Sequence, residues 1–314
     1  MYGQTASIGS SPANEVVRRA LTGQRLNLGE VWFQALLLGS LVVAVGILVS
    51  LLADVLQLGS GVLAERGVDF LTSSTSSNPQ IAGVGQGIFG SLLIVGFVIA
   101  VAFPIGIGAA IYLEEYARDT RLTRLLNASI RNLAGVPAIV YGLLGLGIFV
   151  LTLSWFTGGR SVIAGGLTMA ALVMPIVVIT TAEALRAVPQ TIREAAFGVG
   201  ATKWEVIRHH VLPYAAPGIF TGSILTISRA FGETAPLVLA GGVLGGFAAP
   251  PGKGIVETLQ GPYTALPLII FNWARQPSDE FRQLSAAAII VLLLIILLLN
   301  GAAILLRNRF ERRW

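Results

Sequence analysis

The chain has 314 residues and a mean hydropathy of +0.77, and only 12% of its residues are charged. A typical soluble domain carries about 25% charged residues, so this composition excludes a water-facing surface over most of the chain and predicts lipid as the surrounding solvent. The formal net charge of +5 is modest and gives no reason to expect a nucleic-acid partner. The absence of cysteine excludes disulfides and thiolate metal sites.

Six segments are long and apolar enough to span a membrane, which takes about 20 mostly apolar residues. In chain order they are expected at residues 31–56, 87–113, 133–153, 162–182, 218–243 and 284–306. The first lies too deep and runs too long to be a cleaved signal peptide. The prediction is therefore an all-α membrane protein with six transmembrane helices in one domain over residues 31–306.

The lysines and arginines gather on one side of these predicted spans. Fifteen of the 21 lie there, five lie on the other side, and Arg229 falls inside a predicted span. Positive charge favours the cytoplasmic side, so both termini are expected in the cytoplasm. The N-terminal arm (residues 1–30) and the basic tail (residues 307–314) are then cytoplasmic.

Two long connections fall on the opposite, external side. The stretch of about thirty residues after the first span is polar and rich in serine around residues 73–79, which predicts a flexible loop. Residues 245–283 carry five prolines and the aromatic residues Tyr263, Phe271 and Trp273. Aromatic side chains are favoured at a membrane interface, so this segment is expected to form a structured external cap.

The cytoplasmic connection over residues 187–213 has strong local signals. Residues 190–199 predict a short helix, and Gly200 fits its left-handed C-terminal cap. Thr202 and Glu205 have the T-x-x-E spacing of a capping box, which predicts a second short helix that the proline at the end of the segment closes or bends. Two short helices with an apolar stripe are typical of a docking element, although an ordinary amphipathic connector has the same pattern.

This connection resembles the ATPase-coupling loop of ABC importer permeases. The family pattern is Glu-Ala-Ala, three residues, glycine, nine residues, an aliphatic residue, one residue, and then Leu-Pro. The chain has His210 at the aliphatic position and the other residues of the pattern at the same spacing: Glu194, Ala195, Ala196, Gly200, Leu212 and Pro213. The resemblance implies a type I ABC importer permease fold, in which this loop sits in a groove of the ATPase subunit and transmits its closure.

Further segments resemble the PstA-type permeases of bacterial phosphate importers: residues 104–116, 133–142, 229–237 and 265–274. The run Arg-x-x-Gly-Glu-Thr-Ala-Pro that starts at Arg229 is the most specific of them. The resemblance covers the chain from about residue 84 to its end. It implies an inner-membrane subunit that works with a PstC-like second permease, a PstB-like ATPase homodimer and a PstS-like external phosphate-binding protein.

Arg229 and Glu233 are the candidates for the substrate path or its gate. An arginine within an apolar span costs about 2.5–3.5 kcal/mol unless it is solvated or paired, and Glu233 lies one helical turn away. Gly232 and Pro236 allow the helix to bend there. The guanidinium fork matches phosphate, and a neighbouring carboxylate would weaken its grip so that the anion can leave. A structural ion pair, or a gate latch that never touches phosphate, would use the same residues.

Two other functions remain open at this point: a permease for sulfate or molybdate, and a membrane sensor or assembly protein that docks a cytoplasmic partner through the same loop. The chain has no P-loop motif, so any ATPase site belongs to a separate subunit. The spacing Gly85-x-Gly87-x-x-Gly90 matches a dinucleotide fingerprint, but it opens an apolar span and indicates helix packing instead. No cofactor and no metal is expected.

Overall fold

The computed structural model of the chain describes residues 28–245 and 254–310, and these form two compact units divided after residue 54. The predicted N-terminal arm up to residue 27, residues 246–253 of the predicted cap and the last four residues of the predicted tail lie outside the described part. In the first unit, residues 28–54 are the start of helix α2 (Leu28–Thr72), and every side chain there is exposed. Such an apolar helix requires lipid or another protein around it.

In the second unit, α2 continues to Thr72 with a kink at Gly67, where φ is +32°, so the expected flexible loop after the first span is wrong over most of its length. The remaining turn is held by Arg66, which donates hydrogen bonds to the carbonyl oxygens of Pro79 at 2.9 Å and Ala82 at 2.8 Å. Phe70 and Val84 on either side are fully buried. The burial of these apolar side chains fixes the segment, despite the serines between them.

The described residues are helical in long stretches, and the membrane class is confirmed. Five helices are long and apolar enough to cross a membrane, or six if one bent pair counts as a single span. After α2 the order is α3 (Gly85–Ile111), η1 (Tyr112–Tyr116), α4 (Arg121–Ala134), α5 (Ala138–Gly145), η2 (Leu146–Thr152), α6 (Ser154–Thr157), α7 (Val162–Arg186), α8 (Gln190–Gly198), α9 (Lys203–Val206), η3 (Ile207–Val211), α10 (Leu212–Gly232), α11 (Ala235–Leu239), α12 (Ile255–Leu259), α13 (Leu266–Ala274) and α14 (Asp279–Phe310), where η denotes a π-helical stretch.

The bent pair covers Arg121–Ala134 and Ala138–Thr152, and its bend falls at the start of the predicted third span (residues 133–153). Helices α4 and α5 meet at 101°, and the break falls directly before Pro137. Proline has no N–H to donate and disfavours helical backbone in the residue before it, so the helix cannot run through. The Tyr141 hydroxyl donates to the carbonyl oxygen of Leu133 at 2.9 Å and ties the two helices together across the bend. The apolar stretch therefore starts a new helix at Ala138.

The fifth span is also different from its prediction. One continuous helix runs from Lys203 through α9, η3 and α10 to Gly232, so the expected second short helix is not separate from the span. The π-helical turn η3 shifts the hydrogen-bond register just before Pro213, whose missing N–H would otherwise interrupt the helix. The helix then ends at Gly232, well before the predicted end at residue 243.

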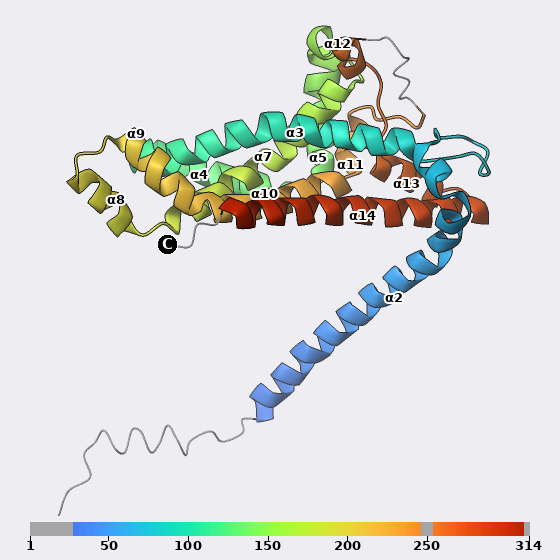
Figure 1. The fold of residues 1–314 in the computed structure, drawn as a ribbon, viewed down its shortest axis with the longest axis horizontal. Helices are drawn as coiled ribbons and strands as arrows, with labels where there is room; N and C mark the ends of the chain where they lie inside the picture. Colours follow the sequence, from blue (N-terminus) through green and yellow to red (C-terminus); the bar gives the residue numbers. More distant parts are fainter. Residues whose placement is uncertain (1–27, 246–253, 311–314) are drawn as a thin grey trace, which may run out of the picture. The chain divides into compact units, whose positions relative to one another are not determined.

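The core lies where α3, α7 and α10 pack together and where α13 inserts against α3 and α14. Figure 1 shows α8 and α9 at one end of this bundle and α13 at the other. Tyr263 and Trp273 are fully buried, and Trp273 stacks obliquely between Phe70 and Phe281 at 6.3 and 6.1 Å between ring centroids. The bundle therefore encloses these two aromatic side chains of the predicted cap, whereas the third, Phe271, is exposed.

The glycines of the Gly85-x-Gly87-x-x-Gly90 run serve helix packing, as expected. A Cβ atom on Gly90 would lie 2.0 Å from the backbone oxygen of Thr264, while a Cβ on Gly96 in the same helix would meet nothing within 4 Å. We expect Gly90→Ala to destabilise the fold by about 1–3 kcal/mol, since overpacking displaces backbone. Thermal unfolding in detergent checks this, with Gly96→Ala as the matched control. Equal melting temperatures for both variants would contradict the packing described here.

Candidate functional site

The segment between α7 and α10 folds through local caps that its sequence predicts. At the end of α8, the Ala201 N–H donates to the carbonyl oxygen of Ala196 at 3.2 Å, and the Gly200 N–H donates to that of Phe197 at 2.9 Å. This is the Schellman pattern, which requires a left-handed residue, and Gly200 has φ +84°. The predicted cap is confirmed, and it sets the direction in which the chain leaves α8.

The predicted capping box at the start of α9 is confirmed as well. The Thr202 N–H donates to Glu205 Oε2 at 2.8 Å, and the Glu205 N–H donates to Thr202 Oγ1 at 3.4 Å. Behind the two caps, Ala196 and Val206 are buried against Leu185 of α7. The segment is therefore attached to the bundle by an apolar patch and presents its opposite face outward.

The residues of the coupling pattern divide between these two faces. Glu194, Ala195, Gly200 and Pro213 are exposed, Ala196 is buried, and Leu212 is half-buried. Three large apolar side chains of the same segment are also exposed in this chain: Phe197, Val199 and Trp204. Exposed apolar side chains next to exposed pattern residues are typical of a surface that a partner covers.

An ion-pair cluster that the sequence did not predict joins this segment to the end of α3. Arg193 of α8 donates to Glu115 of η1 at 2.8 Å, and both side chains are largely buried, at 13% and 10% exposure. Arg193 also donates to the carbonyl oxygens of Leu185 at 2.9 Å and Val188 at 2.8 Å, the first in the last turn of α7 and the second just beyond it. One guanidinium therefore holds three chain segments together.

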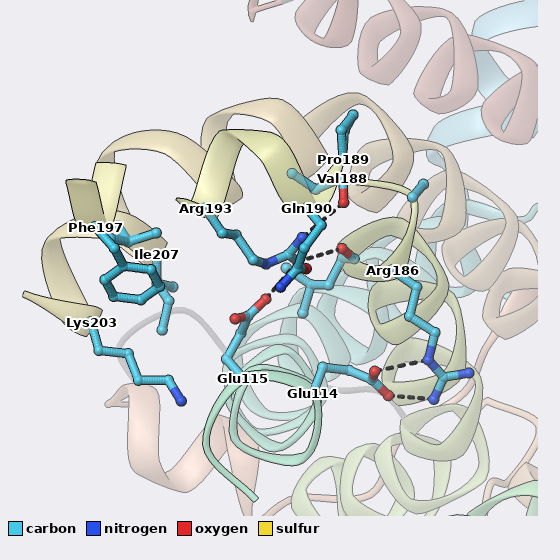
Figure 2. Close-up of a pocket in the computed structure, with 13 residues that line it drawn as sticks. Glu114, Glu115, Arg186, Val188, Pro189, Gln190, Arg193, Phe197, Lys203 and Ile207 are labelled. Carbon is cyan, nitrogen blue, oxygen red and sulfur yellow. Dashed lines mark hydrogen bonds and ion pairs between the residues drawn. The ribbon is translucent and has the colours of Figure 1, made fainter. Parts of the chain in front are cut away.

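The neighbouring residues of η1 extend this cluster. Arg186, the last residue of α7, pairs with both carboxylate oxygens of Glu114, and its Nε donates to Oε2 at 2.8 Å. The Lys203 ammonium lies 5.1 Å from the ring centroid of Tyr116. Figure 2 shows the charged side chains of this cluster and Lys203 around a cleft between η1, α8 and α9. The volume of this cleft is about 620 Å³. In the sequence, Arg186 is explained by the positive-inside pattern alone. Its pairing with Glu114 could not be predicted, because two residues 72 positions apart leave no periodic signal.

The second candidate pair, Arg229 and Glu233, is brought together as predicted. Arg229 Nε lies 3.1 Å from Glu233 Oε1, and the side chains are 44% and 22% exposed. The structure places Arg229 in the last turn of α10, one turn before the helix ends, instead of in the middle of a continuous span. Glu233 has extended backbone and ends α10, as expected if the helix opens between Gly232 and Pro236.

The two motif-bearing segments at 133–142 and 229–237 contact each other beside this pair. A Cβ on Gly142 of α5 would lie 2.8 Å from the Cα of Pro236 in α11, so only glycine permits this approach. The carbonyl oxygen of Leu237 accepts a hydrogen bond from the buried Tyr263 hydroxyl at 3.1 Å. The break in the fifth span is thus fixed from two sides.

Residues 102–314 match the family model described as binding-protein-dependent transport system inner membrane component. The chain belongs to this family. Its members are inner-membrane permease subunits of ABC transporters without an ATPase site of their own, which work with an ATPase and a substrate-binding protein. The cluster around Arg193 and the pair Arg229–Glu233 both lie within the part of the chain that matches the family.

Similar proteins agree with this assignment. The phosphate transport system permease protein PstA of Haemophilus influenzae is 34% identical over 223 residues, which are 70% of this chain and 74% of that protein. The probable ABC transporter permease protein YqgI of Bacillus subtilis is 30% identical over 58% of this chain, and the chain spans 60% of its length.

Solved structures show the fold. A chain of a bacterial alginate ABC transporter, in complex with an alginate pentasaccharide-bound periplasmic protein, aligns with a TM-score of 0.62. The alignment covers 97% of this chain and 98% of that one at 15% sequence identity. A chain of the MetNI methionine ABC transporter aligns with a TM-score of 0.56 over 73% of this chain and 96% of its own length, at 16% identity.

Proposed function

We propose that the chain is a PstA-type permease subunit of an ATP-driven phosphate importer and forms half of the translocation pathway. The observation that carries the proposal is the partly exposed pair Arg229–Glu233 at a break in the fifth span, within the motif run that the chain shares with this type of permease. The PstA proteins among its relatives are phosphate transport system permeases by name.

The chemistry at the break suits passage of an oxyanion. The last carbonyl groups of α10 have no helical N–H partners, and such backbone is tolerated at membrane depth only inside protein or beside water. Arg229 is nearly half exposed there, and its guanidinium has N–H groups left to donate. Phosphate would be held by charge-assisted hydrogen bonds, while Glu233 orients the arginine and limits its affinity for the anion. The site would then bind weakly enough to release.

A continuous helix connects this site with the docking segment. From Lys203 to Arg229 the chain is helical without a break, which spans about 39 Å at 1.5 Å per residue. If the ATPase displaces α9, the continuous helix would therefore transmit that displacement to Arg229. Coupling is proposed to run through Glu194, Ala195, Ala196, Gly200, Leu212 and Pro213.

The proposed assembly follows from these surfaces. A PstC-like permease would complete the pathway, and each of the two copies of a PstB-like ATPase would grip one coupling loop. A PstS-like phosphate-binding protein would dock on the opposite side, where residues 245–283 lie in the proposed topology. Residues 1–30, the coupling loop (residues 187–213) and residues 307–314 would be cytoplasmic, and membrane lipid would surround the transmembrane helices within residues 31–306.

Substrate competition tests the choice of phosphate over sulfate and molybdate. The reconstituted complex, with its binding protein and ATP, is given radiolabelled phosphate together with an excess of each unlabelled oxyanion. We expect unlabelled phosphate to suppress the uptake of label and sulfate or molybdate to leave it unchanged. Suppression of the labelled uptake by sulfate or molybdate instead of by phosphate would overturn the phosphate assignment. It would leave the permease fold intact.

A further inference from the structure

We infer that η1, at the end of the second span, is a second route by which movement of the coupling segment reaches the transmembrane helices. In this route Glu114 and Glu115 are positioning residues that transmit the movement of α8 to α3. This inference rests on the proposed function, because it presumes that an ATPase moves α8. The docking segment continues covalently only into α7 and α10. Side-chain contacts alone can carry its movement to α3.

Arg193 is placed to transmit the movement of α8 to the end of α3. It lies one residue before Glu194 of the coupling pattern, and its guanidinium reaches Glu115 and two carbonyl oxygens at the end of α7 at 2.8–2.9 Å. The pair is largely buried, so solvent screens it little and its geometry is restricted. A shift of α8 must then either carry Glu115 along or leave two buried charges unpaired.

Glu114 provides a parallel connection. Its carboxylate accepts both hydrogen bonds of a forked contact from Arg186, and its side chain is only 14% exposed. Forked arginine–carboxylate contacts fix orientation as well as distance. Consecutive acidic residues of one π-helical turn therefore hold the end of α7 and the start of α8 at the same time.

Glu114 and Glu115 are consecutive in η1 and point in different directions around the helix axis, so each reaches its own arginine. Successive side chains on a regular α-helix point about 100° apart, and the wider π turn at Tyr112–Tyr116 ends α3 directly after the two glutamates. Tyr116 adds the contact with Lys203 at the start of α9. All three elements around the docking surface thus meet the last turn of the second span.

A purely structural clamp would have the same contacts, and the two roles differ in their effect on coupling. A structural clamp changes stability or assembly when it is removed. A transmission element leaves the complex assembled but changes the amount of phosphate moved per ATP hydrolysed.

The test compares the reconstituted natural complex with the conservative variant Glu115→Gln and with the reversals Glu114→Arg and Arg186→Glu, separately and combined. Asp119→Asn is the matched control, because Asp119 pairs with Arg124 at 3.6 Å on the surface with both side chains mostly exposed. Phosphate uptake and ATP hydrolysis are measured in the same vesicles. We expect Glu115→Gln and each single reversal to lower the transport-to-hydrolysis ratio by about fivefold or more. The combined reversal restores the ratio, and Asp119→Asn leaves it unchanged.

A second readout does not depend on transport. The chain has no cysteine, so single reporter cysteines at the exposed positions Tyr112 in η1 and Thr191 in α8 can carry an environment-sensitive fluorophore. ATP with vanadate should change the emission of both probes in the natural complex. In Glu115→Gln the probe at residue 191 should still respond and the probe at residue 112 should not.

The outcomes separate the inference from the function on which it rests. An unchanged transport ratio and two responding probes in Glu115→Gln would overturn the inference and leave the proposed function standing. If neither probe of the natural complex responds to ATP and no phosphate accumulates, the proposed function itself is wrong, and the inference falls with it. A loss of assembly in the single variants that the combined reversal repairs, without any change in ratio, would show a structural clamp only.

Discussion

Replacing Arg229 by alanine is expected to reduce ATP-driven phosphate uptake about 10- to 100-fold while the complex still assembles and hydrolyses ATP. A hydrogen bond to a charged group contributes about 1.5–3 kcal/mol, and the guanidinium is the cationic group that the structure places at the break between α10 and α11. The side chain is 44% exposed, so its removal leaves no large cavity. Uptake of labelled phosphate into proteoliposomes, with ATPase activity measured in parallel, checks the expectation.

Two further variants sharpen this prediction. Arg229→Lys keeps the charge but loses the planar fork, so we expect uptake between that of the natural protein and that of the alanine variant. Arg124→Ala removes an arginine from an exposed surface pair and should leave uptake unchanged. Normal uptake by Arg229→Ala would make the Arg229–Glu233 pair purely structural, and the anion path would then belong to the partner permease.

Replacing Gly200 by valine is expected to uncouple the ATPase, with phosphate uptake reduced about tenfold or more. Gly200 has φ +84°, a conformation that costs an ordinary L-residue about 1–2 kcal/mol and a β-branched residue more. The strained backbone at residue 200 can relax by opening the C-terminal cap of α8. This change would redirect the exposed face of the coupling segment. Uptake and ATPase binding in the purified complex measure the effect.

The matched control is the same substitution at Gly159, which has φ +81° and, like Gly200, has space for a Cβ atom with no neighbour within 4 Å. Gly159 lies between α6 and α7, outside the coupling segment. Gly159→Val should therefore retain uptake, and Gly200→Asn should retain most of it because asparagine tolerates the left-handed conformation. Equal losses at both glycines would indicate general destabilisation and contradict a specific role for the cap.

Features that depend on a few neighbouring residues could be predicted from the sequence. The Schellman cap at Gly200 and the capping box of Thr202 and Glu205 are confirmed because their hydrogen bonds close within six residues. The pairing of Arg229 with Glu233 is confirmed for the same reason, since one helical turn separates them. Hydropathy also located the long apolar helices, because lipid imposes the same requirement on each of them.

Features that depend on tertiary contacts could not be predicted. Hydropathy does not distinguish an apolar residue that faces lipid from one buried in the bundle, so the burial of Trp273 could not be read from the sequence. The bend at Pro137 and the end of α10 at Gly232 divide apolar runs that look continuous in the sequence. The contacts of Glu114 and Glu115 with arginines more than 70 residues away exist only after α3 and α7 have packed together.

The most direct test of the central claim is net phosphate accumulation by sealed vesicles that contain the full complex, with the binding protein outside and ATP at the face that carries the ATPase. We expect accumulation against a phosphate gradient with hydrolysable ATP and none with a non-hydrolysable analogue. Accumulation without ATP hydrolysis, or ATP hydrolysis stimulated by the loaded binding protein with no phosphate entering, would contradict an ATP-driven phosphate permease.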